Sequence, residues 1–291
     1  MSVPGARVSY RRMALRNQIV GVIRFSFPAT GGFAASRLGA GALEAMLYDP
    51  ARLDRRFAWF EGITLPSLAA QTDDAFRCVI LAGETLPAAS RDRLRSLCAD
   101  HAFLDLCLHP AGGPLSSAKR AFRQAVDGDS THVTGFRLDD DDAVARDYVA
   151  RTRARSDALL AGGFATGPTA LAFTHGLSWN LRAPDRPFHA LRETCAPSVA
   201  CAMITDAAIA TCVYRYNHRR IASFVPTFLE PGDAPMFVRT LHDLNDSGRT
   251  VPPHAEALET PDGLSVLAER FGLDPARTTS LMAPDPDGAG R

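Results

Sequence analysis

The first half of the chain alternates short apolar runs with longer segments of helical periodicity. The apolar runs have the character of buried strands and lie at 19–23, 76–82, 103–108 and 132–138. Helices are expected over about 53–70 with a bend at Pro66, over 86–97, over 115–126 with Ser116 or Ser117 as the cap, and over 143–160. Continuous apolar strands joined by helices predict an α/β protein whose mostly parallel sheet is flanked by helices.

The second half shows a weaker pattern. We expect a strand followed by a turn at 171–179, a partly helical segment at 199–214, an irregular segment at 226–253 and a short helix at 263–271. Residues 1–17 form a basic, disordered extension in this prediction, and residues 276–291 form a flexible tail. The sequence contains no internal repeat and no linker that would divide residues 18–275 into two domains.

The charge balance limits the classes of partner. The chain has 32 Lys and Arg against 32 Asp and Glu, so it carries no basic excess of the kind that a dedicated nucleic-acid binder uses on phosphate. The apolar run at 19–27 is too short to span a bilayer or to act as a secretory signal. We therefore expect a cytoplasmic protein whose basic extension is either solvated or in peripheral contact with anionic membrane lipid.

Four consecutive aspartates, Asp139 to Asp142, begin where the predicted strand at 132–138 ends. A run of like charges is commonly a solvated loop, but ligands of open α/β sheets bind outside the carboxyl ends of the strands. Hard divalent cations such as Mn²⁺ and Mg²⁺ prefer carboxylate oxygens and can share them with substrate phosphates. The run lacks the glycine and glutamate spacing of an EF-hand loop. Its position therefore favours a site for a metal and a phosphorylated ligand.

Several segments resemble a known family in its order along the chain. The segment RLDDDD at 137–142 resembles the DxD element of GT-A glycosyltransferases, and more closely the equivalent segment of the putative rhamnosyltransferase family. The segments GVIRFS at 21–26, LPSLAAQT at 65–72, LP at 86–87 and YNH at 216–218 are similar to further parts of that family. The resemblance covers about residues 19–275 and is strongest before residue 165. It implies a GT-A-like fold, with a nucleotide-sugar-binding half at 18–160 and a less regular acceptor half at 161–275.

The resemblance also implies roles within the acidic run. Asp139 would lie near the ribose or base and the metal, Asp141 would bind the metal, and Asp142 would be a second ligand or orient the first. The alternating pair Asp140 and Asp142 stays open as an alternative, because a slip of one residue turns every side chain to the other face. The expected cofactor is Mn²⁺ or Mg²⁺.

Four residues are candidates for binding the donor or the metal; the alternatives are a surface position for Arg24, a solvated helix face for Lys119 and a structural role for His218. Arg24 ends the first strand, and Lys119 precedes the acidic strand on a helix where it could meet a phosphate as a point charge. Arg137 shares a sheet face with Asp139 if the strand continues. His218 is a candidate metal ligand, because neutral imidazole binds Mn²⁺.

An inverting transferase needs a carboxylate base to take a proton from the acceptor hydroxyl. Asp185, Glu193 and Asp206 lie in the appropriate half, and Asp206 is the preferred candidate. The glutamate–aspartate signature usual in such enzymes is absent, so a retaining mechanism stays open.

Together these features predict a metal-dependent hexosyltransferase, inverting in its expected mechanism. It would move a sugar, by the family's name rhamnose, from a nucleoside-diphosphate-sugar to a glycan or lipid-linked acceptor. One alternative is a nucleotidyltransferase, which also uses paired aspartates and would place the Gly-rich segment 28–41 with Arg37 on the nucleotide. The other alternative is a GT-A-like domain that binds a nucleotide or glycan without turnover.

Overall fold

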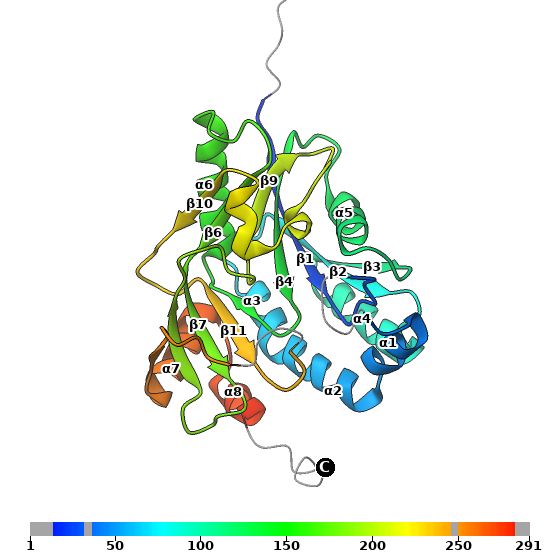
Figure 1. Cartoon of the computed structure of the whole chain (residues 1–291), viewed down its shortest axis with the longest axis vertical. Coiled ribbons are helices and arrows are strands. Elements are labelled where there is room, and N and C mark those ends of the chain that lie inside the picture. Colours follow the sequence, from blue (N-terminus) through cyan, green and yellow to red (C-terminus); the bar gives the residue numbers. More distant parts are fainter. Residues whose placement is uncertain (1–13, 32–36, 246–249, 283–291) are drawn as a thin grey trace, which may run out of the picture.

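The structure is a computed structural model that describes residues 14–31, 37–245 and 250–282. Two mixed sheets and the helices around them make up the fold (Figure 1). The helices are α1 (Ala40–Leu47), α2 (Pro50–Trp59), α3 (Leu65–Ala69), α4 (Ala88–Asp100), α5 (Pro114–Ala125), α6 (Tyr148–Ala161), α7 (Thr260–Phe271) and α8 (Pro275–Met282), with a π-helical turn η2 (Phe60–Thr64) and 3₁₀ turns η3 (Val213–Arg215) and η4 (His218–Ser223).

The larger sheet has seven strands in the order β10-β6-β9-β4-β1-β2-β3. Its strands are β1 (Asn17–Arg24), β2 (Phe76–Gly83), β3 (Leu104–His109), β4 (His132–Asp139), β6 (Thr169–Phe173), β9 (Ala202–Asp206) and β10 (Thr227–Glu230). The pairs among β1, β2, β3 and β4 are parallel, whereas β9 runs antiparallel to β4 and β6. The predicted α/β class with a mostly parallel sheet is confirmed.

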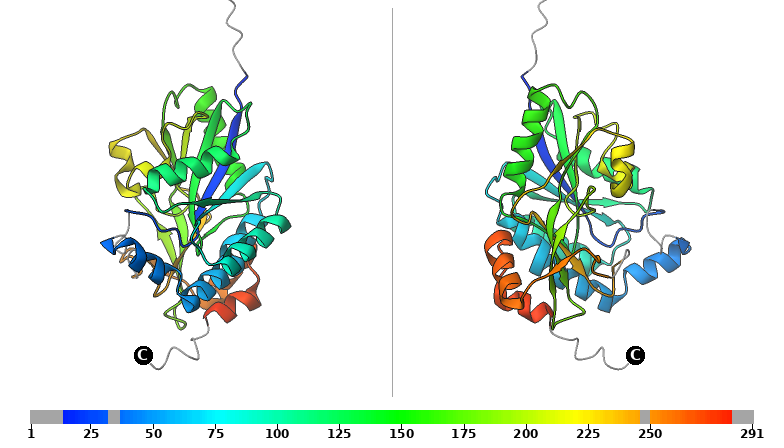
Figure 2. Two further views of the ribbon diagram at one scale, coloured as in Figure 1. Left: turned by 90° about the vertical axis from the view of Figure 1, so that its right-hand side faces the viewer. Right: turned by 60° about the vertical axis from the view of Figure 1, so that its left-hand side comes forward.

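Both faces of this sheet are covered, as the continuous apolar strands predict. In β1, Ile19 and Ile23 pack into a core shared with α2 and α6, and Val20 and Val22 pack on the opposite face against α5. The two views of Figure 2 show helices on either side of the strands. Because the side chains of a strand alternate between faces, one short run supplies both cores.

The smaller sheet has five strands in the order β12-β8-β7-β11-β5. They are β5 (Ala143–Val144), β7 (His175–Asn180), β8 (Phe188–Arg192), β11 (Phe237–Leu241) and β12 (Glu256–Ala257). Since β5 begins directly after Asp142, this sheet brings β11 beside the end of the acidic run. Within the described residues, no helix combines the length and apolar character that a membrane crossing requires.

The helix predicted over 53–70 is continuous from α2 through α3, and a π-helical turn replaces the expected bend. Asp49 caps its start by accepting a hydrogen bond from the Arg52 N–H. The Leu65 N–H bonds to the Phe60 carbonyl five residues back, just before Pro66. A wider turn there accommodates the proline ring, which would otherwise clash with the preceding turn.

Other local predictions differ from the structure. Helix α5 begins at Pro114 after Gly113, and the Ser116 hydroxyl donates to the Gly113 carbonyl instead of capping. The segment 143–160 starts as β5 before α6. The segment 171–179 contains parts of two strands in different sheets, and 199–214 contains β9 instead of a helix. Helix α8 covers 275–282 with Thr278 and Met282 buried, within the predicted tail; residues 1–13 and 283–291 lie outside the described residues.

The centre of the larger sheet leaves no space for a side chain at Gly21. A Cβ atom there would lie 2.4 Å from a ring carbon of Phe136 and 2.7 Å from the Cys78 sulfur. We expect Gly21→Ala to lower the free energy of unfolding by about 1–3 kcal/mol through overpacking. Urea denaturation would measure the change. Gly128→Ala is the matched control, because its Cβ meets no atom within 4 Å; equal stability of the two variants would contradict the prediction.

Candidate functional site

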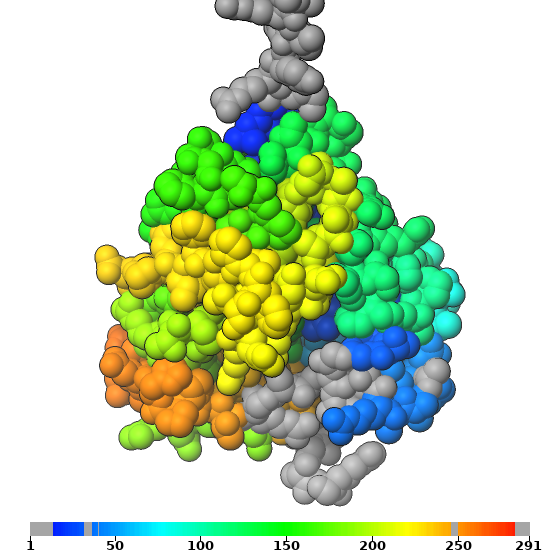
Figure 3. Space-filling model, turned by 45° about the horizontal axis from the view of Figure 1, so that its top comes forward, coloured from blue at the N-terminus to red at the C-terminus, as the bar shows by residue number. Residues whose placement is uncertain are grey.

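A pocket of about 540 Å³ lies outside the carboxyl ends of β1 and β4. Its walls come from the acidic run, from residues 214–218, and from β11 and the residues after it. In the space-filling view a hollow opens between the yellow segment that contains residues 214–218 and the green and blue segments opposite (Figure 3). Six arginines and three aspartates line the pocket: Arg24, Arg52, Arg56, Arg137, Arg215, Arg239, Asp139, Asp141 and Asp142.

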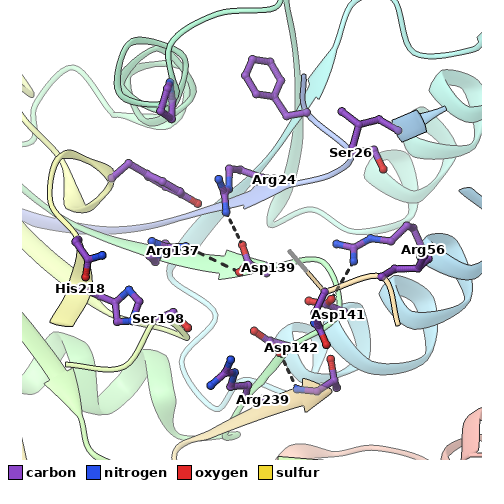
Figure 4. A pocket seen from close by; sticks show the side chains of 18 of the residues that line it. Arg24, Ser26, Arg56, Arg137, Asp139, Asp141, Asp142, Ser198, His218 and Arg239 are labelled. Atoms are coloured by element: carbon purple, nitrogen blue, oxygen red, sulfur yellow. Dashed lines mark hydrogen bonds and ion pairs between the residues drawn. The ribbon is translucent and has the colours of Figure 1, made fainter. Parts of the chain in front are cut away.

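Asp139 is held between two arginines on neighbouring strands. Arg24 and Asp139 are register partners at the ends of β1 and β4, and their side chains form an ion pair of 3.1 Å. Arg137, two residues earlier on β4, pairs with the other carboxylate oxygen at 3.9 Å (Figure 4). Burial acts to raise the pKa of Asp139, but these guanidinium charges outweigh it and the pKa lies below its ordinary value. Both arginines therefore stay oriented into the pocket by one carboxylate.

The aromatic ring of Tyr214 packs against the guanidinium groups of the same two arginines. The guanidinium carbons of Arg24 and Arg137 lie 5.3 and 5.0 Å from the ring centroid, within range of a cation–π interaction. The Tyr214 hydroxyl donates a hydrogen bond of 3.0 Å to the Val22 carbonyl, which anchors the ring to β1. Burial raises the pKa of this hydroxyl to about 12, so it stays a donor at neutral pH.

The turn after β4 buries Asp140 and exposes Asp141 to the pocket. Asp140 does not line the pocket; it is fully buried and bound by the Arg56 guanidinium, whose Nε donates at 3.0 Å. Arg56 also donates to Asp141 at 2.9 Å, and Nε2 of His242 lies 2.7 Å from the same carboxylate oxygen. The His242 ring stacks on Trp59 with centroids 3.8 Å apart. The alternative pair of Asp140 with Asp142 therefore has no support from this geometry.

The protonation states of Asp141 and His242 follow from these contacts. Burial acts to raise the pKa of Asp141, but the Arg56 charge and the hydrogen bond to His242 outweigh it, and the pKa is lowered. Burial lowers the pKa of His242, against the opposing effect of Asp141. At neutral pH Asp141 is therefore an ionised carboxylate within a fixed set of donors.

Asp142 lies in the pocket among like charges. Its carboxylate accepts a hydrogen bond of 2.9 Å from the Thr240 N–H of β11, and its carbonyl accepts one of 2.8 Å from Thr64 in the π-helical turn. Burial, followed by the charges of Asp141 and Asp139, raises the pKa of Asp142 well above its ordinary value. A further cation near this carboxylate would relieve that repulsion.

Of the three aspartates predicted as metal ligands, Asp141 and Asp142 suit a divalent cation better than Asp139 does. The described residues contain no group of three or more His, Cys, Asp or Glu side chains placed to hold an ion by themselves. Asp139 already has two guanidinium partners. Asp141 and Asp142 face the pocket together, and Mg²⁺ sites commonly combine one or two carboxylates with water and substrate phosphates. These two aspartates therefore fit a metal that arrives with a diphosphate.

His218 begins η4 and lines the pocket, but its surroundings are cationic. Burial, together with the charges of Arg137, Arg219 and Arg239, lowers its pKa to about 4. Three guanidinium groups near one imidazole disfavour a divalent cation at the same place. His218 as a metal ligand stays a prediction, one that these charges disfavour, and His242 is the histidine that contacts Asp141.

Two other predicted site residues lie outside the pocket. Lys119 on α5 is absent from the lining and lies near Cys212, where burial raises the pKa of the thiol to about 11 and the Lys119 charge opposes that rise. Asp206 is exposed and pairs in register with His132, at the start of β4. Since β4 rises about 3.3 Å per residue, Asp206 is roughly 23 Å from the end that carries Asp139. Because β9 runs antiparallel to β4, Asp206 therefore lies at the opposite end of the strands from the pocket, and the structure gives its predicted role as the base no support.

The structure adds residues that the sequence pattern did not indicate. Arg56, Tyr214, Arg239 and His242 lie in three separate parts of the chain and meet only around the acidic run. The one available signal was indirect, because four adjacent carboxylates near a sheet end require cations among them. Gln71 of the LPSLAAQT segment has a structural role instead. Its amide donates a hydrogen bond to the Ala145 carbonyl and accepts one from the Val149 N–H, close to the acidic run in the chain.

Comparison with known proteins gives both a family and distant structural likenesses. No curated protein matches the chain. Crystal structures of S. aureus TarS residues 1–349 resemble it: the complex with UDP-GlcNAc has 12% identity and a TM-score of 0.44, covering 91% of this chain and 70% of TarS 1–349. The complex with UDP has 11% identity, the same TM-score and the same coverage. A further TarS 1–349 structure has 11% identity and a TM-score of 0.40, with 77% of this chain covering 60% of that one.

Sequence provides the firmer assignment. The family model described as "Putative rhamnosyl transferase" matches residues 18–254, which is most of the chain and includes the whole acidic run. The matched region also contains every pocket-lining residue. The chain therefore belongs to the putative rhamnosyl transferase family of glycosyltransferases, the family that its motifs resemble.

Proposed function

We propose that this glycosyltransferase binds a nucleoside-diphosphate-sugar in the pocket at the ends of β1 and β4 and transfers its sugar to a hydroxyl-bearing acceptor. The observation that carries the proposal is the combination of an acidic run with an excess of arginines at one sheet edge. Ligands of open α/β sheets bind at the carboxyl ends of the strands, which is where this pocket lies. The distant likeness to TarS in complex with UDP-GlcNAc is in keeping with such a donor.

The arginines suit the diphosphate. Arg24 and Arg137 are oriented by Asp139 and Tyr214, and Arg239 lies across the pocket from them (Figure 4). Guanidinium groups bind phosphate oxygens in bidentate fashion and remain charged at any physiological pH. As the bond from the sugar to the phosphate breaks, negative charge grows on the leaving diphosphate. Arginines fixed before the reaction stabilise that charge without having to reorganise.

The proposal also includes a divalent cation bound beside the diphosphate. Asp141 and Asp142 would hold Mn²⁺ or Mg²⁺ together with the diphosphate, and the ion would neutralise further charge on the leaving group. The protein's own contribution is to keep Asp141 ionised and fixed through Arg56 and His242. Rhamnose as the sugar, and a glycan or lipid-linked molecule as the acceptor, remain part of the proposal on the strength of the family's description alone.

A panel of nucleoside diphosphates tests the donor site directly. We expect one diphosphate, in the presence of Mn²⁺, to stabilise the protein by about 2.7 kcal/mol at a hundred times its Kd. The thermal unfolding midpoint with UDP, GDP, ADP, CDP and dTDP, each with and without Mn²⁺, would measure this. Asp139→Asn should weaken the response because it releases Arg24 and Arg137, whereas Asp206→Asn should leave it unchanged.

Two outcomes would redirect the proposal. If a diphosphate stabilises the protein equally with and without Mn²⁺, the arginines alone bind the diphosphate, and the proposed metal site is contradicted. No response to any diphosphate would contradict a donor site and favour a domain without turnover. The nucleotidyltransferase alternative relied on the Gly-rich segment 28–41, of which residues 32–36 lie outside the described residues. It predicts binding of nucleoside triphosphates in preference to diphosphates.

A further inference from the structure

The segment 207–229, which borders the donor pocket, contains no aspartate or glutamate. Its three arginines, Arg215, Arg219 and Arg220, are all exposed. Within the part of the chain that the structure describes, none of these three guanidinium groups has a carboxylate at ion-pair distance, whereas two arginines of α6 pair with Glu230, directly after the segment. Like charges gathered on one segment favour the approach of an anion. The segment therefore carries positive charge that the protein itself does not neutralise.

Two of these arginines lie on aromatic rings that are stacked on each other. The guanidinium carbon of Arg215 is 5.7 Å from the centroid of the Tyr216 ring. Tyr216 is stacked on Phe224, with centroids 5.0 Å apart and ring planes inclined by 11°. The guanidinium carbon of Arg220 is 6.0 Å from the Phe224 centroid, and Phe224 is 55% exposed. These contacts hold cations and rings in place before a ligand arrives. We refer to these four residues and Arg219 as the rim.

The rim is continuous with the donor pocket. Arg215 and Tyr216 line the pocket, whereas Arg220 and Phe224 do not, so the row of stacked side chains leads from the pocket wall to the surface. In Figure 3 the yellow segment that contains the rim forms one side of the hollow. The reacting hydroxyl of an acceptor must lie beside the donor sugar, and the remainder of the acceptor must extend out of the pocket. The rim is therefore placed to contact that remainder.

The donor does not account for the charge of the rim. In the proposed function, Arg24, Arg137 and Arg239 bind the diphosphate, and a divalent cation at Asp141 and Asp142 neutralises it further. The three arginines of the rim lie outside that set. Guanidinium groups bind phosphate and carboxylate oxygens in bidentate fashion, and rigid aromatic rings offer apolar contact area. This combination suits a sugar chain that carries anionic groups.

We propose that the rim binds an anionic acceptor, a glycan whose sugars carry phosphate or carboxylate groups, and holds it beside the donor pocket. This proposal rests on the proposed function and adds the charge class of the acceptor. The arginines pair with the anionic groups, and Tyr216 and Phe224 contact the carbon atoms of the sugars. An anionic membrane would also attract arginine. However, Arg215 and Tyr216 form part of the wall of a concave pocket, which a single glycan chain can enter and a flat lipid surface cannot.

The test measures the binding of labelled oligosaccharides to the full chain by fluorescence polarisation. Maltohexaose, phosphorylated maltohexaose and a galacturonic acid hexamer keep the chain length constant and change only the charged group. We expect one of the charged probes to bind about tenfold or more tightly than maltohexaose, and which one binds identifies the anion. Three exposed ion pairs each contribute little, so we expect about a tenfold loss of that affinity in the triple variant Arg215→Gln, Arg219→Gln and Arg220→Gln.

A second triple variant with the same change in net charge serves as the control. It replaces three exposed arginines that do not line the pocket, Arg55→Gln, Arg186→Gln and Arg277→Gln, and should keep the affinity within about twofold of wild type. Phe224→Ala tests the ring separately and should weaken the charged probe about threefold. The unfolding midpoint verifies that each variant is folded, and Phe224→Ala alone decides the matter if the rim triple variant is not.

Several results would overturn the proposal. Equal affinity for all three probes, or an equal loss in the two triple variants, would show that the rim does not select an anion. Vesicles of phosphatidylcholine with and without phosphatidylglycerol test the membrane. Binding only to the anionic vesicles, lost in the rim variant, with neither charged oligosaccharide bound, would make the rim a membrane contact. A wild type that is stabilised by a diphosphate but binds neither charged probe contradicts this proposal alone. One that binds a charged probe but no diphosphate contradicts the proposed donor site instead.

Discussion

Replacement of Asp141 by asparagine is expected to reduce sugar transfer by about 10³-fold while leaving the protein folded. Asparagine keeps the volume of the side chain and one oxygen for Arg56 and His242, but it loses the negative charge. In the proposed function, the negative charge of Asp141 holds the divalent cation that neutralises the leaving diphosphate. Metal stabilisation of developing charge supplies several kcal/mol, and each 1.4 kcal/mol corresponds to about tenfold in rate.

The measurement is the rate of diphosphate release from the donor, with the Mn²⁺ concentration varied. In Asp141→Asn the Mn²⁺-dependent part of the rate should disappear, whereas in Asp206→Asn it should match wild type because that side chain lies at the other end of the sheet. The unfolding midpoint of each variant verifies that it is folded. A rate within tenfold of wild type, still dependent on Mn²⁺, would show that Asp141 does not hold the cation.

Replacement of Arg56 by methionine is expected to destabilise the fold by about 3–5 kcal/mol. Arg56 is buried and supplies the guanidinium that binds both Asp140, which is fully buried, and Asp141. Methionine preserves the length and apolar packing of the side chain but leaves Asp140 without its cation. Breaking one side of a buried ion pair costs this much because the remaining charge stays desolvated.

Urea denaturation followed by the fluorescence of Trp59 and Trp179 would measure the loss. Arg55→Met is a matched control, because Arg55 is the adjacent residue of α2 and is exposed. The double variant Arg56→Met with Asp140→Asn should recover most of the stability, since the charge left unpaired is then absent. A loss below about 1 kcal/mol in Arg56→Met, or no recovery in the double variant, would contradict the role assigned to this pair.

The local parts of the fold could be predicted because their signals are local. The run IVGVI at 19–23 and the run FRCVILA at 76–82 form buried strands, since every side chain except Arg77 is apolar and half of the residues are β-branched. The same holds for the strand that ends at Asp139. The position of the acidic run at the carboxyl end of that strand was enough to indicate a ligand site there. The pairing of Arg137 with Asp139 followed from the two-residue period of a strand.

Predictions failed where the answer depended on strand direction or on distant neighbours. The segment at 199–214 is apolar enough for a helix, but it forms β9 because it completes the sheet between β4 and β6. Short apolar runs do not distinguish a strand from a buried helix without such context. Asp206 was a reasonable base in the linear sequence, and the antiparallel direction of β9 placed it at the opposite edge.

By itself the sequence determined the α/β class, the family, and the acidic run as the candidate ligand site. These properties depend on composition and spacing within segments of a few residues, where backbone geometry is set by local sterics and burial. Only the tertiary structure decided that Arg56 and His242 contact Asp140 and Asp141, and that Lys119 lies outside the pocket. The physical reason is that Arg56 and His242 lie 84 and 101 residues along the chain from the carboxylates they contact, and no local pattern records which distant groups the fold brings together.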